Sequence, residues 1–352
     1  MPATKIVSLT SSSIANSSAC IFQKFLNHVM LNRRSFIKTT SIAAGSLFAA
    51  NALKAATSKK SHLDKIGLQL FSIPKLLEQD FEGTMKLLSQ IGYKEFEFYG
   101  PYPFSTQAAQ DSWKAVTPSL GFSGSGYFGR TPQQVKDILD KYNLSTPTMH
   151  VDLDTLRKNM NGIADAAHVL GTTYVGLPAI PQNERTNLDA YKRMADEFNK
   201  ISEAAQKVGL KYFYHNHGYG LKEMEGSIPF DVILLRTDPK LVFFEMDIYW
   251  MTAGGADLVK YLDNNPNRFK LMHIKDMTKQ VRFSGNGGDP KQWIELFPYM
   301  TTAGSGVLDL KTIISHAKKS GMEHFIVEQD RVNDITAITK SYNYLSSLEL
   351  NA

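Results

Sequence analysis

Short apolar runs alternate with amphipathic stretches along the chain from about residue 64 onward. The apolar runs are rich in aromatic and β-branched residues and predict strands, whereas apolar positions three and four residues apart predict helices. We expect strands at about 65–71, 95–99, 145–151, 174–177, 211–217, 241–247, 269–274 and 324–328. We expect helices at about 81–92, 131–144, 154–170, 188–208, 228–237, 256–264, 308–319 and 334–348.

About eight strand–helix pairs within residues 64–348 predict an α/β fold, a (β/α)8 TIM barrel. The main alternative is an open, doubly wound parallel sheet. That alternative is weakened because no Gly-rich phosphate-binding motif follows the first predicted strand. Two connections, 100–130 and 275–307, are longer than usual, and in a barrel both would lie above the face that carries the active site.

Four of the predicted strands end in a polar side chain that can bind a metal, namely His215, Asp247, His273 and Glu328. In a TIM barrel these strand ends meet at one face. Two imidazoles and two carboxylates suit a divalent metal ion such as Mn²⁺, Co²⁺, Zn²⁺ or Mg²⁺. We therefore predict one metal site, which would polarise a carbonyl and stabilise the enediolate formed when a neighbouring C–H loses its proton. His217 is an alternative to His215 as the ligand.

The same strand ends offer catalytic candidates. His217 lies two residues beyond His215 and on the same side of the strand, so we predict that its imidazole is the base. Lys275 points the same way as His273 and is predicted to hydrogen-bond a substrate oxygen or the developing oxyanion. Two further polar residues complete the set, Glu97 as a catalytic candidate and His150 as a substrate-binding one.

Aromatic residues are frequent in the two long connections and after the sixth predicted strand. Tyr102, Phe104 and Trp250 are the candidates for stacking on the apolar face of a sugar ring. The alternative, in which such side chains pack the connections onto the barrel rim, is equally open.

The first 57 residues follow a different pattern. An Arg-Arg-x-Phe-x-Lys motif at 33–38 precedes a modest apolar run at 42–52, which resembles a twin-arginine signal peptide. That run is too short to span a bilayer, and so is every later apolar segment. We expect a cleavable leader over 1–57 and a periplasmic protein. A disordered basic tail is the alternative, and Met30 is an alternative start.

Charge and cysteine content narrow the partners. The formal net charge is +5, but six of the 39 basic residues and none of the 34 acidic residues lie within 1–57. The remaining 33 basic residues leave a net charge of −1, so the sequence gives no argument for a nucleic-acid partner. The single cysteine, Cys20, also lies in the leader. Histidines and carboxylates must therefore hold any metal, and thiolate catalysis is excluded.

Six short motifs in this order resemble the sugar phosphate isomerase/epimerase family, which has a xylose isomerase-like TIM barrel. They lie at 67–72, 91–97, 214–217, 244–250, 273–276 and 327–330. The resemblance covers 64–348 and implies a divalent metal and proton abstraction beside a carbonyl. It places Asp247, His273 and Glu328 at the family's metal positions. Many members have a Glu where this chain has His215, a departure that favours His217 as the base.

Exported relatives of this barrel are associated with oxidised glycosides. We therefore expect a 3-keto-glycoside 1,2-lyase, in which the enolate formed at C2 expels the C1 substituent. An isomerase or epimerase acting on a free sugar or sugar phosphate is a close alternative. An apurinic-site endonuclease and a non-catalytic sugar-binding barrel are remote ones. The expected partner is a small sugar or keto-glycoside, and a homo-oligomer stays open because barrels of this kind often pair.

Overall fold

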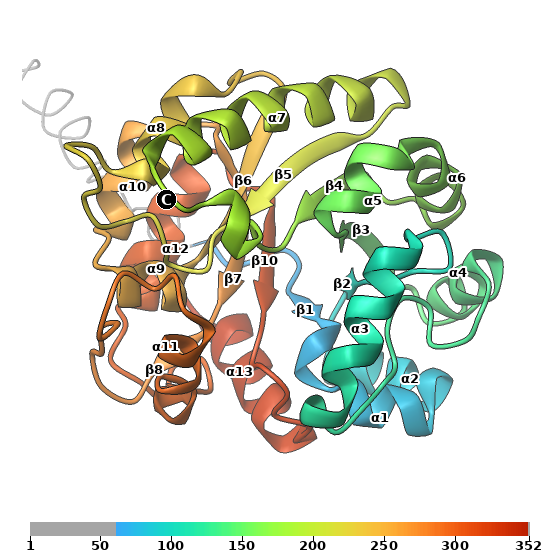
Figure 1. Ribbon diagram of the computed structural model, residues 1–352. Coiled ribbons are helices and arrows are strands. Elements are labelled where there is room, and N and C mark those ends of the chain that lie inside the picture. Colours follow the sequence, from blue (N-terminus) through green and yellow to red (C-terminus); the bar gives the residue numbers. More distant parts are fainter. Residues whose placement is uncertain (1–60, 351–352) are drawn as a thin grey trace, which may run out of the picture. The chain divides into compact units, whose positions relative to one another are not determined.

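The computed structural model describes residues 61–350, in which eight parallel strands close into a barrel (Figure 1). The strands follow one another around the barrel in chain order, and the last one pairs with the first. They are β1 (Gly67–Gln69), β2 (Glu95–Tyr99), β3 (Ser145–His150), β4 (Tyr174–Leu177), β5 (Lys211–His215), β6 (Val242–Asp247), β7 (Phe269–Ile274) and β10 (His324–Val327). The predicted (β/α)8 TIM barrel is therefore confirmed.

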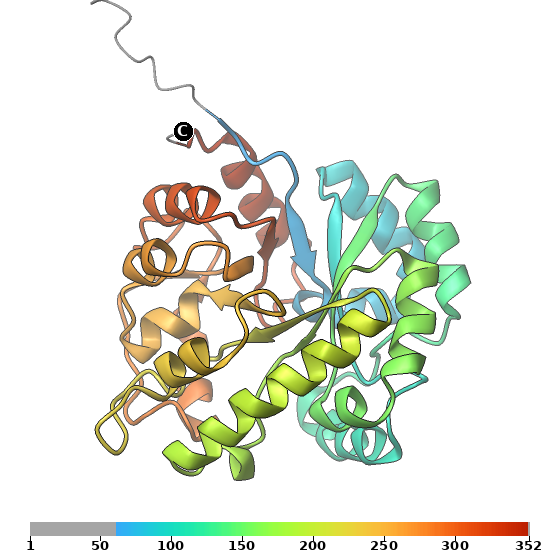
Figure 2. The same cartoon turned by 90° about the horizontal axis from the view of Figure 1, so that it is seen from above.

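Helices connect the strands and surround the barrel (Figure 2). The α-helices are α1 (Pro74–Gln79), α2 (Phe81–Ile91), α3 (Gln107–Leu120), α4 (Pro132–Lys141), α5 (Leu153–Lys158), α6 (Met160–Leu170), α7 (Leu188–Lys207), α8 (Pro229–Arg236), α9 (Ile248–Gly254), α10 (Leu258–Asn264), α11 (Pro290–Ile294), α12 (Leu310–Lys319) and α13 (Ile335–Ser347). Three 3₁₀ turns lie at Leu70–Ser72, Gln182–Glu184 and Phe297–Tyr299. The predicted helix at 154–170 is instead two helices, because the Asn159 side chain caps α6 by accepting a hydrogen bond from the Gly162 N–H.

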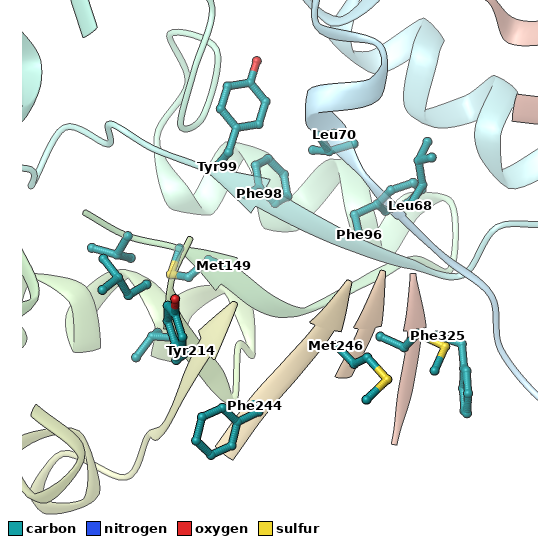
Figure 3. Close-up of a cluster of buried hydrophobic side chains, with 14 of the residues drawn as sticks. Leu68, Leu70, Phe96, Phe98, Tyr99, Met149, Tyr214, Phe244, Met246 and Phe325 are labelled. Atoms are coloured by element: carbon teal, nitrogen blue, oxygen red, sulfur yellow. The ribbon is translucent and has the colours of Figure 1, made fainter. Parts of the chain in front are cut away.

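Alternation of side chains along each strand divides the core into two regions. Residues such as Phe96, Phe98 and Phe244 are buried between the barrel and the surrounding helices, and Figure 3 shows several of them. The residues between them point into the barrel. There, a separate buried cluster fills the interior, namely Tyr174, Phe213, Leu271 and Ile326. One step further along these inward-facing rows, polar side chains replace the apolar ones.

Both long connections contain structure of their own. The first holds α3, which begins at the capping side chain of Thr106. The second holds α11 and a two-stranded antiparallel sheet of β8 (Asp276–Met277) and β9 (Met300–Thr301). The buried Asp276 carboxylate accepts hydrogen bonds from the backbone N–H groups of Gly304, Gly306 and Leu308. These bonds tie the end of the second connection to the strand from which it starts.

A buried carboxylate, that of Glu95, forms an ion pair with an exposed lysine at the opposite end of the barrel from the candidate site. Glu95, the first residue of β2, is 3.2 Å from Lys65 Nζ and 2.8 Å from His324 Nδ1. Burial raises the pKa of Glu95, but the hydrogen bonds and charges of His324 and Lys65 outweigh burial and hold that pKa below its usual value. We therefore expect Glu95→Gln to lower the free energy of unfolding by about 1–2 kcal/mol near pH 7.

The stabilisation by Glu95 should depend on pH. Because the folded state lowers the pKa, the contribution is present above the unfolded pKa near 4.3 and is lost as the pH falls through the folded value. In urea denaturation, the stability difference between wild type and Glu95→Gln should shrink between neutral pH and about pH 3. A difference that stays constant over this range would contradict the assignment. Glu203→Gln, at an exposed position of α7, is the matched control.

The expected leader over 1–57 and its twin-arginine motif lie outside the described residues. Between residues 61 and 350, no helix combines the length and the apolar character needed to cross a membrane.

Candidate active site and metal centre

The four predicted metal ligands come together at the carboxyl ends of the strands. In the strand register His215 lies opposite Glu245, and Asp247 lies opposite His273. All these side chains belong to the inward-facing rows, and all are buried. Glu328 directly follows β10 and is 94% buried, with 6% of its surface exposed. The barrel thus places residues from four separate strands within one cluster.

His215 is oriented by a carboxylate behind it. Its Nδ1 lies 2.8 Å from Glu245 Oε2, and because a carboxylate can only accept, this nitrogen carries the proton. The other nitrogen, Nε2, is buried, makes no hydrogen bond, and lies 3.7 Å from Asp247 Oδ2. Burial and the neighbouring His273 lower the pKa of His215. Its Nε2 therefore presents a lone pair to the space beside Asp247.

His273 is also oriented by a carboxylate behind its ring. Its Nε2 lies 2.7 Å from Glu97 Oε1 on β2, so this nitrogen is the donor. Its Nδ1 lies 2.8 Å from Glu328 Oε2 and 4.0 Å from Asp247 Oδ2, without hydrogen-bond geometry to either. Burial opposes the charged imidazole, but Glu245, Glu328 and Glu97 raise the pKa of His273 well above its usual value. The surrounding carboxylates therefore favour a positive charge at Nδ1, which either a proton or a bound metal ion would supply.

These residues fit a divalent metal ion. A tetrahedral ion with ligands at about 2.0–2.2 Å spaces those ligands roughly 3.4 Å apart. The separations of 3.7 Å, 4.0 Å and 2.8 Å among His215 Nε2, Asp247 Oδ2, His273 Nδ1 and Glu328 Oε2 lie on both sides of that value. Ligand atoms of Asp247, His273 and Glu328 all lie within 4.8 Å of one another.

The charges of the clustered side chains also favour a bound cation. Five carboxylates surround the histidines, but a single ammonium, that of Lys275, contacts them within this cluster. The carboxylates belong to Glu97, Glu245, Asp247, Glu328 and Asp330. A buried excess of negative charge is costly unless a cation compensates it. The residues present therefore suit a metal ion, and an alternative grouping of His150, His215, Glu245 and His273 lies deeper beside it.

Glu245 acts on the metal ligands through hydrogen bonds. Burial raises its pKa, but His273, His150 and His215 outweigh burial and hold the pKa of Glu245 well below its usual value. We expect Glu245→Gln to weaken metal affinity about 10- to 100-fold, because the amide no longer orients His215 as strongly. Competition with a metallochromic chelator measures the change, and exposed Glu203→Gln should bind metal like wild type. Unchanged affinity in Glu245→Gln would contradict this role.

The Lys275 ammonium contacts three carboxylates of the cluster. Its Nζ lies 2.8 Å from Asp247 Oδ2, 2.5 Å from Glu328 Oε2 and 3.0 Å from Asp330 Oδ2. Burial disfavours its charge, but these carboxylates raise the pKa of Lys275 well above its usual value. The side chain is fully buried and does not line the cavity above the site. Lys275 therefore holds the carboxylates of Asp247 and Glu328 in place, and its predicted contact with a substrate oxygen stays a prediction.

Glu97 and His150 also join the cluster. Glu97 is fully buried and is held by Gln69 Nε2 at 2.7 Å and by the Thr148 hydroxyl. His150 lines the cavity, and its Nε2 lies 2.8 Å from Glu245 Oε2. Burial opposes its charge, yet Glu97 and Glu245 raise the pKa of His150. His150 thus lies at the cavity, where its substrate-binding role stays a prediction, whereas Glu97 orients His273 from behind.

His217, the predicted base, lines the cavity beside His215, with ring centroids 4.5 Å apart. Gly218 follows with a φ of 80°, and a Cβ there would overlap the backbone of Trp250, so only glycine suits this turn. His217 stacks on Trp293, with centroids 5.2 Å apart, and its buried Nδ1 makes no hydrogen bond. Burial, His215 and Lys275 lower the pKa of His217 well below its usual value. Its imidazole is therefore neutral, with a lone pair on one ring nitrogen.

A cavity of about 550 Å³ opens above the cluster. The three aromatic candidates do not line it. Tyr102 is fully buried and stacks on Phe104 at a centroid distance of 4.9 Å, and Trp250 packs against Phe283. For these residues the structure matches the alternative, in which they pack the connections onto the barrel. Other aromatic residues line the cavity instead, Phe71, Tyr99 and Trp113.

The sequence interpretation missed two polar residues of the cavity floor. Gln69 ends β1 and binds Glu97, and Asp330 lies two residues beyond Glu328, within reach of Lys275. Burial raises the pKa of Asp330 to about 6, although Lys275 opposes the shift. Both lie in motifs noticed in the sequence, at 67–72 and 327–330. The alternation of side chains could have identified both, because each lies two residues from another residue that points into the barrel.

Comparison with known proteins identifies relatives. A family model described as xylose isomerase-like TIM barrel matches residues 85–348. A solved sugar phosphate isomerase/epimerase from Parabacteroides distasonis ATCC 8503 is 25% identical, with a TM-score of 0.61 over 85% of this chain and 98% of that one. A structure described as IOLI protein with a binding zinc atom shares the fold at 14% identity and a TM-score of 0.55, over 80% of this chain and 98% of that one.

The curated proteins that match this chain include dehydratases. Inosose dehydratases from Lacticaseibacillus casei and Clostridium tetani (strain Massachusetts / E88) are 25% and 27% identical over 170 residues. These alignments cover 45% of this chain and 55% and 54% of the relatives. The chain thus spans about half the length of the curated relatives it matches.

Proposed function

Because the chain belongs to the xylose isomerase-like TIM barrel family, as the sequence motifs predicted, we propose that it is a metal-dependent carbohydrate enzyme that removes a proton beside a carbonyl. One observation carries this proposal. The buried nitrogens His215 Nε2 and His273 Nδ1 make no hydrogen bond, and both converge on Asp247 Oδ2, which Lys275 holds at 2.8 Å. A divalent ion bound there would act as a Lewis acid on the carbonyl and favour loss of the neighbouring proton.

The reaction we propose is a β-elimination from a 3-keto-glycoside. A base takes the proton from C2, the electrons of that C–H bond form the C1=C2 double bond, and the C1–O bond breaks. The departing oxygen takes up a proton, which leaves a 2-hydroxy-3-keto-glycal and the free aglycone. The dehydratase relatives support elimination, because a dehydratase also expels an oxygen substituent.

The cavity favours an uncharged sugar over a sugar phosphate. Among the described residues that line it there is no lysine or arginine, while four carboxylates do so, Asp152, Asp154, Glu328 and Asp330. A phosphate would meet repulsion there, and so would a nucleic-acid backbone. The hydroxyl groups of a neutral sugar can instead donate to these carboxylates.

We assign a separate role in this reaction to each of four residues. His217 is the proton acceptor, since its neutral ring faces the cavity beside His215. His150 and Gln69 meet the sugar hydroxyls at the cavity floor. Lys275 keeps Asp247 and Glu328 in place from below.

Export to the periplasm belongs to the same proposal. It is supported by the motif at 33–38 and is testable by fractionating cells that express the full chain.

The test is an assay of the Mn²⁺-loaded protein with a 3-keto-glucoside. We expect release of the aglycone together with the unsaturated sugar, and loss of turnover on chelation. The parent glucoside, which lacks the keto group, is the control and should not react because its C2 proton is not acidified. Absence of both aglycone release and C2 proton exchange in D₂O would overturn the proposal.

A sugar isomerase or epimerase is the second candidate. It is favoured by the similarity to the isomerase/epimerase from Parabacteroides distasonis, 98% of whose chain is covered. Both reactions begin with the same deprotonation, so C2 exchange in D₂O is common to them. Exchange or conversion of a free hexose without aglycone release from the 3-keto-glucoside would support the isomerase or epimerase instead.

A further inference from the structure

Helix α3 presents an apolar face that the rest of the described chain covers only in part, since Trp113 packs against Tyr99 and Phe122 at the edge of the core. None of its fourteen residues is buried, although a surface helix normally packs its apolar stripe on the core. The stripe consists of Ala108, Ala109, Trp113 and Val116, spaced so that they share one face. Val116 is 44% exposed. All four residues line the cavity above the candidate metal centre.

The structure holds α3 in this position from both ends. Before the helix, the Thr106 N–H donates to Thr155 Oγ1 at 3.0 Å. After it, the backbone N–H of Ser123 donates to Glu78 Oε1 at 2.7 Å. The helix is thus fixed with its apolar face toward the cavity. Figure 1 shows α3 near β1 and β2, at the end of the barrel where these strands finish.

The cavity is larger than one sugar ring needs. Its volume of about 550 Å³ lies within the range of roughly 300–1,000 Å³ typical of sites for drug-sized ligands. Its floor is polar, with His150, His215 and Glu328, and its wall along α3 is apolar except for Ser112. The two regions belong to one cavity. A ligand that fills it therefore has a polar part and an apolar part.

The polar atoms of the aromatic wall are already satisfied. Trp113 Nε1 donates to the Ser123 carbonyl at 2.7 Å, and the Tyr99 hydroxyl donates to the Gly124 carbonyl at 2.8 Å. A second sugar on this wall would bury several hydroxyl groups with few partners, at about 1–3 kcal/mol for each. An aromatic ring needs no such partners and can pack on Trp113 and Phe71. The wall therefore suits an apolar group.

We infer that the α3 wall is an aglycone subsite, and that the substrate is a glycoside with an aromatic aglycone. This inference rests on the proposed function, because it names the leaving group of that elimination. The sugar ring lies on the polar floor near His217, and the aromatic aglycone lies against Trp113 and Val116. The C1–O bond that breaks lies between the two regions.

The first experiment is a binding measurement that needs no turnover. Phenyl, methyl and glucosyl β-glucosides without the keto group are titrated calorimetrically into the full chain loaded with Mn²⁺. We expect the phenyl glucoside to bind at least about tenfold more tightly than the methyl glucoside, because the ring buries additional apolar surface. Equal affinities, or tighter binding of the glucosyl compound, would overturn the subsite.

Two valine variants locate the effect. Val116→Asp introduces a charge on the wall and should remove most of the preference for the phenyl compound, so that the phenyl and methyl glucosides bind with similar affinity. Val169→Asp, at a 39% exposed position of α6 that does not line the cavity, is the matched control. If Val116→Asp keeps the full preference, the subsite lies elsewhere and the inference fails.

The two proposals can fail separately. A phenyl preference in binding without any turnover of 3-keto-glucosides would support the subsite and reject the lyase. Turnover of phenyl and methyl 3-keto-glucosides with equal kcat/KM, together with equal binding, would support the lyase and reject the subsite.

Discussion

Replacement of Asp247 by asparagine should abolish metal binding and lower turnover about a thousandfold or more, which corresponds to about 4 kcal/mol of lost transition-state stabilisation. Asp247 Oδ2 lies between the unpaired nitrogens of His215 and His273, at 3.7 Å and 4.0 Å. An amide NH₂ in its place cannot ligate a metal and would face the ammonium of Lys275. Metal content after dialysis, measured by mass spectrometry, and turnover are the two readouts.

The asparagine variant is chosen because Asp247 also caps a helix. Its Oδ1 accepts a hydrogen bond from the Trp250 N–H at 2.9 Å at the start of α9, and an asparagine carbonyl can keep that bond. Asp257→Asn is the matched control, since exposed Asp257 caps α10 in the same way. It should retain full metal content. A metal-replete Asp247→Asn protein would show that this carboxylate is not a ligand.

The sequence predicted the strands better than the connections. The bounds of β2, β4 and β7 match their predictions, because buried strands are read directly from apolar runs with turn signals at each end. Helix α3 was not predicted, and the reason is physical. Its apolar stripe is short, and none of its residues is fully buried although Trp113 and Leu120 pack against the edge of the core, so the periodicity that identifies other helices is weak there.

The clustering of the four candidate ligands could be predicted, but the pairing of the side chains within the cluster could not. Strand parity and the TIM barrel together bring His215, Asp247, His273 and Glu328 to one place, and both follow from the local pattern. The contacts of Lys275 with the carboxylates of neighbouring strands were not predicted. Such cross-strand pairing depends on register and side-chain length, which the sequence alone does not specify.

The aromatic candidates illustrate the same limit. Tyr102, Phe104 and Trp113 all lie in the first long connection, and composition does not distinguish them. The fold buries Tyr102 and leaves Trp113 on the cavity wall. Which aromatic residue meets a ligand is therefore decided by how α3 sits on the barrel, and that is a tertiary property.

Removal of the His217 imidazole should reduce turnover by about 100- to 10,000-fold while leaving metal content unchanged. His217→Phe keeps an aromatic ring on Trp293, whose ring lies 5.2 Å away, so the wall of the cavity stays filled. The variant loses the nitrogen that accepts the proton, and exchange of the substrate C2 proton in D₂O should disappear with turnover. His168→Phe is the matched control, because His168 is exposed on α6, and it should retain full activity.

The metal readout distinguishes the two roles that the sequence left open for His215 and His217. If His217 were the ligand, His217→Phe would lose metal, and His215→Phe would keep it. The geometry favours the opposite outcome, since His215 Nε2 lies 3.7 Å from Asp247 Oδ2 and its Nδ1 is anchored by Glu245. No carboxylate anchors His217 in this way among the described residues, and its ring is held by stacking. A ligand needs a fixed lone pair, whereas a base needs access to the substrate, so retention of metal with loss of C2 exchange would assign His217 as the base.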